Sequence, residues 1–336
     1  ELSSVISSIG ILFFFFSSCL PGIEIVAEVF HVDTYTASAL LVLLAAAYTF
    51  FGGMKSAGIG GMLKMGIIWV ALFIAGWEAF QAVHETAAWS QFPAAQFSLF
   101  GRGVEPALAN LFSVLVGVLC TQTYIQCIFS ADTPSTASAG CFLAAAIVIP
   151  VGLPSVAVGL YMQTLYPDIQ PIMVLPTYLI NEVHPLLGGL AMGGIILSLI
   201  GGIGGLTLGI GTMITRDMIV PLCRMTDDRK MLTVNKLTVL FVMLLACFIA
   251  ILNRGSEVLF WTYISMALRG GGIFLPLTLA VFWPGHVKRG WAVLSMLGST
   301  AAALLTATVV KLTIDPLFVG LIVSALLLLP GIRMKK

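Results

Sequence analysis

The chain has 336 residues, of which 59% are hydrophobic and 9% are charged, and its formal net charge is +1. Soluble domains carry roughly a quarter charged residues, and a water-soluble fold cannot bury this much apolar surface, so the composition excludes one. It predicts an all-α, polytopic membrane protein in which residues 1–336 form a single transmembrane domain. The histidines and cysteines show no metal-ligand spacing, so we expect no metal site, no cofactor and no nucleic-acid partner.

Ten apolar segments predict about ten transmembrane helices, because a helix needs about 20 residues to cross the hydrocarbon. In chain order the predicted helices are 2–29, 36–52, 60–83, 105–130, 137–163, 186–222, 233–252, 258–284, 290–312 and 316–332. The longest of them is expected to extend beyond the bilayer. The chain begins at Glu1, without an initiator methionine, and we expect the N-terminal part of the protein to be missing.

The basic residues predict the orientation through the positive-inside rule. If the first helix starts inside, eleven lie on the inner side and three on the outer side. The inner ones are Lys55, Arg216, Arg224, Arg229, Lys230, Lys236, Lys288, Arg289, Arg333, Lys335 and Lys336, and the outer ones are Arg102, Arg254 and Lys311. Both termini are therefore predicted to be cytoplasmic, in a multi-pass protein of the cell membrane.

Polar groups within the apolar segments are the candidate site residues, because they are costly in lipid unless they are paired or line a path. Thr121, Gln122 and Gln126 lie in the fourth predicted helix, with the two glutamines one turn apart. They indicate either a transport path or hydrogen bonds between helices. The glycine-rich 186–222 segment indicates close helix packing, or a backbone that faces a site.

Two cations also lie inside predicted helices. Arg269 follows Ser265 by one turn, and either a structural ion pair or a functional role would account for its charge. Lys64 lies nine residues after Lys55, roughly 13 Å further along a helix axis. Its side chain could extend to the inner surface, or it could serve the function.

Several motifs in order resemble the sodium:solute symporter family, whose members carry sugars, proline, pantothenate, iodide and small carboxylates. Tyr48–Lys55 is similar to the family's YTxxGG(M/L)K turn, and Gln122–Ala131 is similar to its NQxxxQRxxAA stretch. Thr212–Asp217 and Leu268–Gly290 resemble parts of its eighth and tenth core helices. The resemblance covers nearly the whole chain and implies a LeuT-type bundle of inverted repeats, lacking the first core helices.

The departures from this family concern the ion path. The resemblance implies an aspartate where Gly61 stands, a glutamine where Lys64 stands, and a serine pair where Gly201 and Gly202 stand. Ser198 lies one turn before that pair. Hard oxygen ligands are thus replaced, and we hypothesise that the Lys64 ammonium takes the place of a sodium ion. The coupling ion would then be H⁺ or absent, and Na⁺, the ion of the family, is the alternative.

The solute is expected to be a small amino acid or carboxylate. The positions that the resemblance aligns with sugar-binding residues are Val114, Gly117, Val118 and Val148, which offer few polar groups. The sequence therefore predicts a secondary transporter for a small molecule, embedded in membrane lipid. A sensor module of a two-component system and a degenerate, non-transporting fragment are the alternatives, and the absence of protease or hydrolase motifs argues against an enzyme.

Overall fold

The computed structural model describes residues 2–86, 88–101, 103–310 and 314–332, without the side chains of residues 52–60, 88 and 123. This part of the chain is helical and contains no strand. Its one extended pairing is an antiparallel bridge between Val287 and Ile332. The all-α prediction is therefore confirmed.

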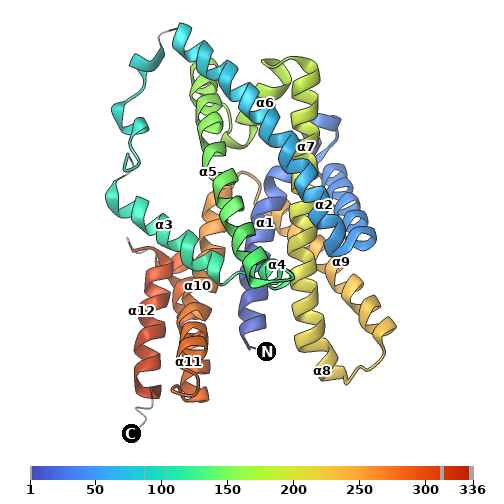
Figure 1. Cartoon of the computed structure of the whole chain (residues 1–336), viewed down its shortest axis with the longest axis vertical. Helices are drawn as coiled ribbons and strands as arrows, with labels where there is room; N and C mark the ends of the chain where they lie inside the picture. The colour runs from blue at the N-terminus through green and yellow to red at the C-terminus, as the bar shows by residue number, and fades with distance from the viewer. Residues whose placement is uncertain (1, 87, 102, 311–313, 333–336) are drawn as a thin grey trace. The chain divides into compact units, whose positions relative to one another are not determined.

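The α-helices follow one another with few long connections (Figure 1). Their bounds are α1 Leu2–Phe30, α2 Thr34–Glu85, α3 Val104–Leu119, α4 Gln122–Phe129, α5 Pro134–Leu165, α6 Val174–Asn181, α7 Pro185–Met213, α8 Val220–Cys223, α9 Asp228–Leu252, α10 Val258–Phe282, α11 Arg289–Leu305 and α12 Pro316–Leu328. The 3₁₀ segments are η1 Ala88–Gln91, η2 Ala94–Phe97, η3 Pro171–Met173 and η6 Leu329–Gly331, and the π segments are η4 Ile214–Ile219 and η5 Thr306–Val310.

Most of the predicted spans are confirmed. Among the described residues, eight stretches are long and apolar enough to cross a membrane, and α3 and α12 are shorter apolar helices at two further predicted spans. Both predicted helices 36–52 and 60–83 fall within α2, which the structure assigns as one helix. Gly52, Gly53, Met54 and Lys55, which belong to the predicted turn between them, have side chains outside the described residues.

Two predictions about the helices are wrong. The segment 105–130 was expected to be one helix, but the chain breaks between α3 and α4. The amide of Thr121 bonds the Val118 carbonyl three residues back at 3.0 Å, which tightens the last turn and ends α3. The residues 164–185, which the predicted helices 137–163 and 186–222 leave as a connection, contain η3 and the additional helix α6.

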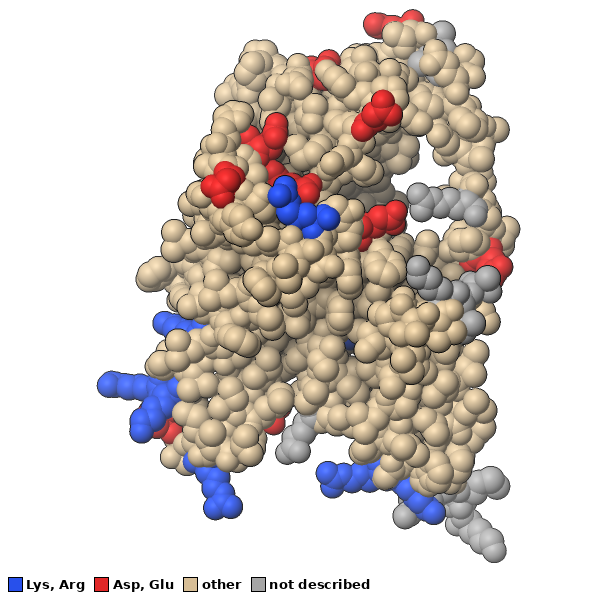
Figure 2. Space-filling view, turned by 180° about the vertical axis from the view of Figure 1, so that it is seen from behind, with Lys and Arg blue, Asp and Glu red and all other residues tan. Residues whose placement is uncertain are grey.

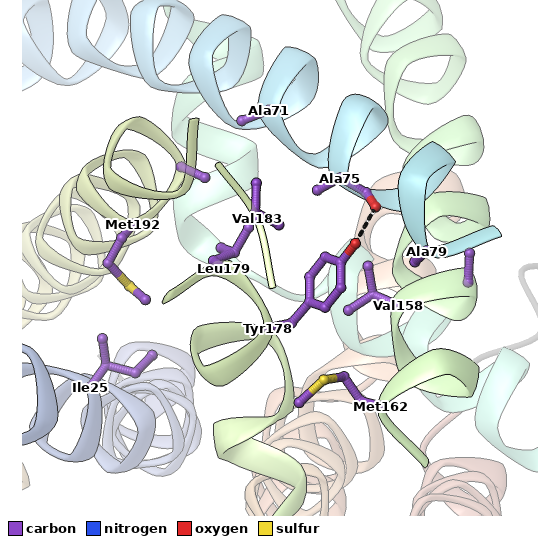
Figure 3. Close-up of a cluster of buried hydrophobic side chains, with 12 residues drawn as sticks. Ile25, Ala71, Ala75, Ala79, Val158, Met162, Tyr178, Leu179, Val183 and Met192 are labelled. Carbon is purple, nitrogen blue, oxygen red and sulfur yellow. Dashed lines mark hydrogen bonds between the residues drawn. The ribbon is translucent and has the colours of Figure 1, made fainter. Parts of the chain in front are cut away.

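The chain divides into two compact units. The first unit comprises residues 1–20, 103–127 and 205–336, and the second comprises residues 21–102 and 128–204. In the second unit, α2 packs against α5, and α6 contributes Tyr178 and Leu179 to the shared core. The Tyr178 hydroxyl donates to the Ala75 carbonyl at 2.8 Å (Figure 3), so its one polar atom is satisfied inside an apolar cluster.

In the first unit, α10, α11 and α12 pack against one another, and α3 packs against α10. Gly271 of α10 and Gly320 of α12 meet at their backbones, because a Cβ built on Gly320 would lie 3.0 Å from the Gly271 Cα atom. Small residues allow this approach, which is a main source of helix association in lipid. At the end of α12, the Lys288 amide donates to the Gly331 carbonyl at 3.0 Å.

Much of the surface is apolar. The visible face in Figure 2 is largely free of Lys, Arg, Asp and Glu side chains. On α5, Ile149 and Leu153 are 77% and 76% exposed. Exposed apolar side chains of this size are costly in water and are typical of a helix face that contacts lipid acyl chains.

Candidate functional site

Arg269 is the most deeply buried charged side chain in the described part of the chain, with 1% of its surface exposed. It lies in the middle of α10, beside the glycines Gly270 and Gly271, in the first unit. Removing a guanidinium from water costs several kcal/mol, so its hydrogen bonds must offset part of that cost. Those contacts converge on the break between α3 and α4.

Thr121, at this break, bonds Arg269 directly. The Arg269 Nη1 group donates to the Thr121 hydroxyl at 2.5 Å, and that hydroxyl donates in turn to the Gly117 carbonyl at 2.7 Å. Thr121 is 2% exposed. The interaction therefore joins α10 to the last turn of α3, where a helix leaves carbonyl groups without intrahelical partners.

Ser265, one turn before Arg269, accepts two more of its hydrogen bonds. Nε donates to the Ser265 carbonyl at 3.1 Å, and Nη2 donates to the Ser265 hydroxyl at 3.0 Å. The Ser265 hydroxyl donates to the Gly10 carbonyl of α1 at 2.5 Å. The guanidinium also lies over the ring of Phe14, 5.8 Å from its centroid, in cation–π contact.

Gly10 gives the arginine its space on α1. A Cβ atom built on Gly10 would lie 2.4 Å from the Cγ atom of Arg269, so a side chain there would displace it. Thr121 at the α3–α4 break and Ser265 and Arg269 on α10 are thus held together beside Gly10 of α1, within one unit, and we call Thr121, Ser265 and Arg269 the arginine cluster.

The ion pair that the sequence offered as one explanation for Arg269 is not found. No carboxylate bonds Arg269 among the described residues, which include every Asp and Glu except Glu1. Three of its five N–H groups are used by the bonds above, and two are left. The charge of Arg269 is therefore hydrogen-bonded without being neutralised.

Lys64 and Gly201 lie together in the second unit, on α2 and α7. A Cβ atom built on Gly201 would lie 3.1 Å from the Lys64 Nζ atom and 3.7 Å from the Tyr48 hydroxyl. Lys64 is half-buried, and no hydrogen bond or ion pair holds its ammonium among the described residues. Because Gly201 has no side chain, there is space beside its backbone, and the Lys64 ammonium borders that space.

The other candidates on these helices are more open. A Cβ atom built on Gly61 or on Gly202 would meet nothing within 4 Å. Ser198 is half-buried on α7, one turn before Gly202. Of the predicted ion-path residues, the structure therefore brings Lys64 into contact distance of Gly201, whereas Gly61 and Gly202 face open space.

Gln122 and Gln126 lie on α4, just after the break, and both are half-buried. They share a helix face, as their spacing predicts. The break itself places Gln122 at the first position of α4, where backbone N–H groups lack intrahelical partners. The sequence named Thr121, Gln122 and Ser265 as candidates but missed that Arg269 joins two of them. An arginine one turn from a serine inside an apolar span was the available signal.

The Thr212–Asp217 motif lies where α7 changes to the π segment η4. The Thr212 hydroxyl donates to the Leu208 carbonyl at 2.6 Å, and the Ser4 hydroxyl of α1 donates to the Asp217 carboxylate. π segments are rare inside α-helices, and those that occur often lie at functional sites. Here it positions Asp217 to bond α1 within the first unit.

The sequence matches no protein-family model and no curated protein. The fold is similar to a solved structure described as the substrate-bound outward-open state of a Na⁺-coupled sialic acid symporter. The two share 17% sequence identity with a TM-score of 0.74, and the match covers 99% of this chain and 74% of that one. At this identity the likeness shows the fold alone. The chain is a multi-pass membrane protein with the helical fold of a Na⁺-coupled symporter.

Proposed function

We propose that the chain is a secondary active transporter of the sodium:solute symporter family that moves a small organic solute across the cell membrane. The observation that carries this proposal is the symporter fold over almost the whole chain. The break between α3 and α4 supports it, because transporters of this kind bind solutes and ions beside discontinuous helices. The solute that fits best is an amino acid or a carboxylate, because the aligned positions Val114, Gly117 and Val118 are apolar or small.

We further propose that no coupling Na⁺ binds at the position where the family resemblance implies a sodium site. The Lys64 ammonium borders Gly201, so a cation already lies beside the residue that replaces a hydroxyl ligand. Two positive charges 4 Å apart repel by about 4 kcal/mol at an effective dielectric constant of 20. A sodium ion beside Lys64 would therefore bind weakly, and H⁺ coupling or uncoupled transport is favoured.

We also propose that both termini of the chain lie in the cytoplasm. Its local support is the contact between the loop before α11 and the end of α12, since the Lys288 amide bonds the Gly331 carbonyl. This contact brings the loop that carries Lys288 next to the end of α12, which supports an inner position for Lys288 and Arg289 under the positive-inside rule. Arg102, Lys311 and the basic residues 333–336 lie outside the described residues.

The test is uptake into proteoliposomes that hold the purified protein. Radiolabelled L-alanine, L-proline, acetate, lactate and glucose are offered with an inward Na⁺ gradient, with an inward H⁺ gradient, and with neither. The proposal expects accumulation of at least one amino acid or carboxylate above empty liposomes. No uptake of any solute under any gradient would count against transport, and uptake of glucose alone would contradict the solute class.

A further inference from the structure

The two ends of the broken helix do not neutralise the buried Arg269. The C-terminus of α3 and the N-terminus of α4 meet at Cys120 and Thr121. A helix C-terminus carries about half a negative elementary charge and a helix N-terminus about half a positive one. The two contributions offset each other at the break, which leaves the full positive charge of the guanidinium.

The remaining contacts do not remove this charge. The acceptors of Arg269 are two neutral oxygens of Ser265 and the neutral hydroxyl of Thr121. Cys120 and Tyr124 interact electrostatically with Arg269, and neither is a carboxylate. A side chain that is 1% exposed thus keeps a positive charge and has two N–H groups that no described residue accepts.

Within a membrane, an ionisable side chain in this condition usually marks a path for a substrate or an ion. The planar guanidinium matches a carboxylate in geometry, with two parallel N–H donors for two oxygens. The N-terminal amides of α4, which has eight residues, start beside Thr121 and add further donors for the same anion.

We propose that the arginine cluster, with the N-terminus of α4, binds the carboxylate group of the transported solute. The proposal rests on the proposed transport function and narrows its solutes to those that carry a carboxylate. In this arrangement Thr121 and Ser265 are positioning residues. They hold Nε and one hydrogen of each Nη group, and they leave the other Nη hydrogens for the solute. The solute carboxylate supplies the missing negative charge.

The experiment measures thermal unfolding of the purified full chain in detergent. The probes are the choline salts of acetate and lactate, and L-alanine, against choline chloride at equal ionic strength and against acetamide. We expect at least one carboxylate to raise the Tm of the wild type, with no rise from acetamide. The dependence of the Tm rise on carboxylate concentration gives an apparent affinity.

The variants test whether Arg269 causes that rise. R269Q removes the charge. Gly10→Ala keeps the charge but displaces the Arg269 side chain, because its Cγ atom lies where the new Cβ atom of residue 10 would be. Both are expected to weaken the carboxylate about tenfold to a hundredfold, the range for charge-assisted hydrogen bonds. R254Q, which removes an exposed arginine between α9 and α10, is the matched control and should bind like the wild type.

Three results of the unfolding experiment, and one of the uptake assay, would overturn the inference. One is the absence of a Tm rise with every carboxylate, and another is an equal rise in wild type and in folded R269Q or Gly10→Ala protein. The third is an equal effect of choline chloride, which would assign the site to an inorganic anion. If the proteoliposomes accumulate a solute with the same KM in wild type and R269Q, transport stands and the carboxylate role of Arg269 fails.

Discussion

The Lys64 ammonium of α2 lies against the bare backbone of Gly201 in α7, 3.1 Å from where a Cβ atom of residue 201 would be. The two residues are 137 positions apart, and each replaces a polar residue that the family resemblance implies. A lysine at 64 and a side chain at 201 compete for the same space. The pair thus connects the loss of a hydroxyl ligand with the gain of a fixed cation.

Gly201→Ala tests this contact. The added Cβ would be 3.1 Å from Nζ, so the ammonium must shift, and we expect a change in transport kinetics together with a Tm below that of Gly202→Ala. Gly202→Ala is the matched control, because its Cβ would meet nothing within 4 Å and should be neutral or slightly stabilising.

A double variant tests whether Lys64 and residue 201 interact directly. In Lys64→Ala, the Gly201→Ala substitution should cost less than it does in the wild type, because the atom it crowds has been removed. Additive effects of the two substitutions on Tm would mean that Lys64 does not occupy the space beside residue 201.

Thr121→Val tests the hydrogen bond that holds Arg269 to the helix break. The valine keeps the shape of threonine but loses the acceptor for Nη1 and the donor to the Gly117 carbonyl. Leaving a buried donor of a charged group unpaired costs about 1–3 kcal/mol, so we expect a clear loss in the free energy of unfolding. Thr121→Ser keeps the hydroxyl and should remain near the wild type, and equal stability of all three proteins would contradict the contact.

Gly320→Ala tests the approach of α10 and α12. Its Cβ would lie 3.0 Å from the Gly271 Cα atom, and backbone atoms of two packed helices cannot move aside cheaply. Overpacking of this kind typically costs about 1–3 kcal/mol. We therefore expect the Tm of Gly320→Ala in detergent to be clearly lower than that of the wild type. Gly290→Ala, whose Cβ would meet nothing within 4 Å, is the control. A Gly320→Ala protein as stable as that control would show that the helices are further apart.

Asp315 predicts a pH dependence. Its carboxylate caps α12 through the Leu317 amide at 2.8 Å and accepts from the Ser113 hydroxyl at 3.2 Å, yet burial raises its pKa above 3.8 despite these bonds. A raised pKa means that the folded state favours the protonated form. The stability that this group contributes is therefore complete below the unfolded pKa and falls as the pH rises through the folded pKa.

Asp315→Asn removes this titration while keeping a capping oxygen. The Tm of the wild type minus that of Asp315→Asn should decrease as the pH rises from the ordinary pKa of an aspartate, about 4, through the raised pKa of the folded state, measured by circular dichroism in detergent. A difference that is flat, or that increases with pH, would contradict the raised pKa.

The sequence predicted the spans because apolar runs of about 20 residues carry their own signal in lipid. It did not predict the break at Thr121, where neither proline nor a charge interrupts the apolar pattern, because the break depends on a hydroxyl, a tightened turn and Arg269 on another helix. The contact of Lys64 with Gly201 was accessible only through the family resemblance, since residues this far apart meet through tertiary packing. The α6 helix was missed because eight residues are too few for a periodic signal.

The most direct test of the account is uptake of an accepted solute into proteoliposomes, measured in wild type, Lys64→Ala and the control Lys230→Ala across a range of external Na⁺. Lys230 is exposed in the first turn of α9. We predict uptake by the wild type and by Lys230→Ala that does not depend on Na⁺, and loss of that uptake in Lys64→Ala. Uptake that requires a Na⁺ gradient in the wild type and keeps the same requirement in Lys64→Ala would contradict it.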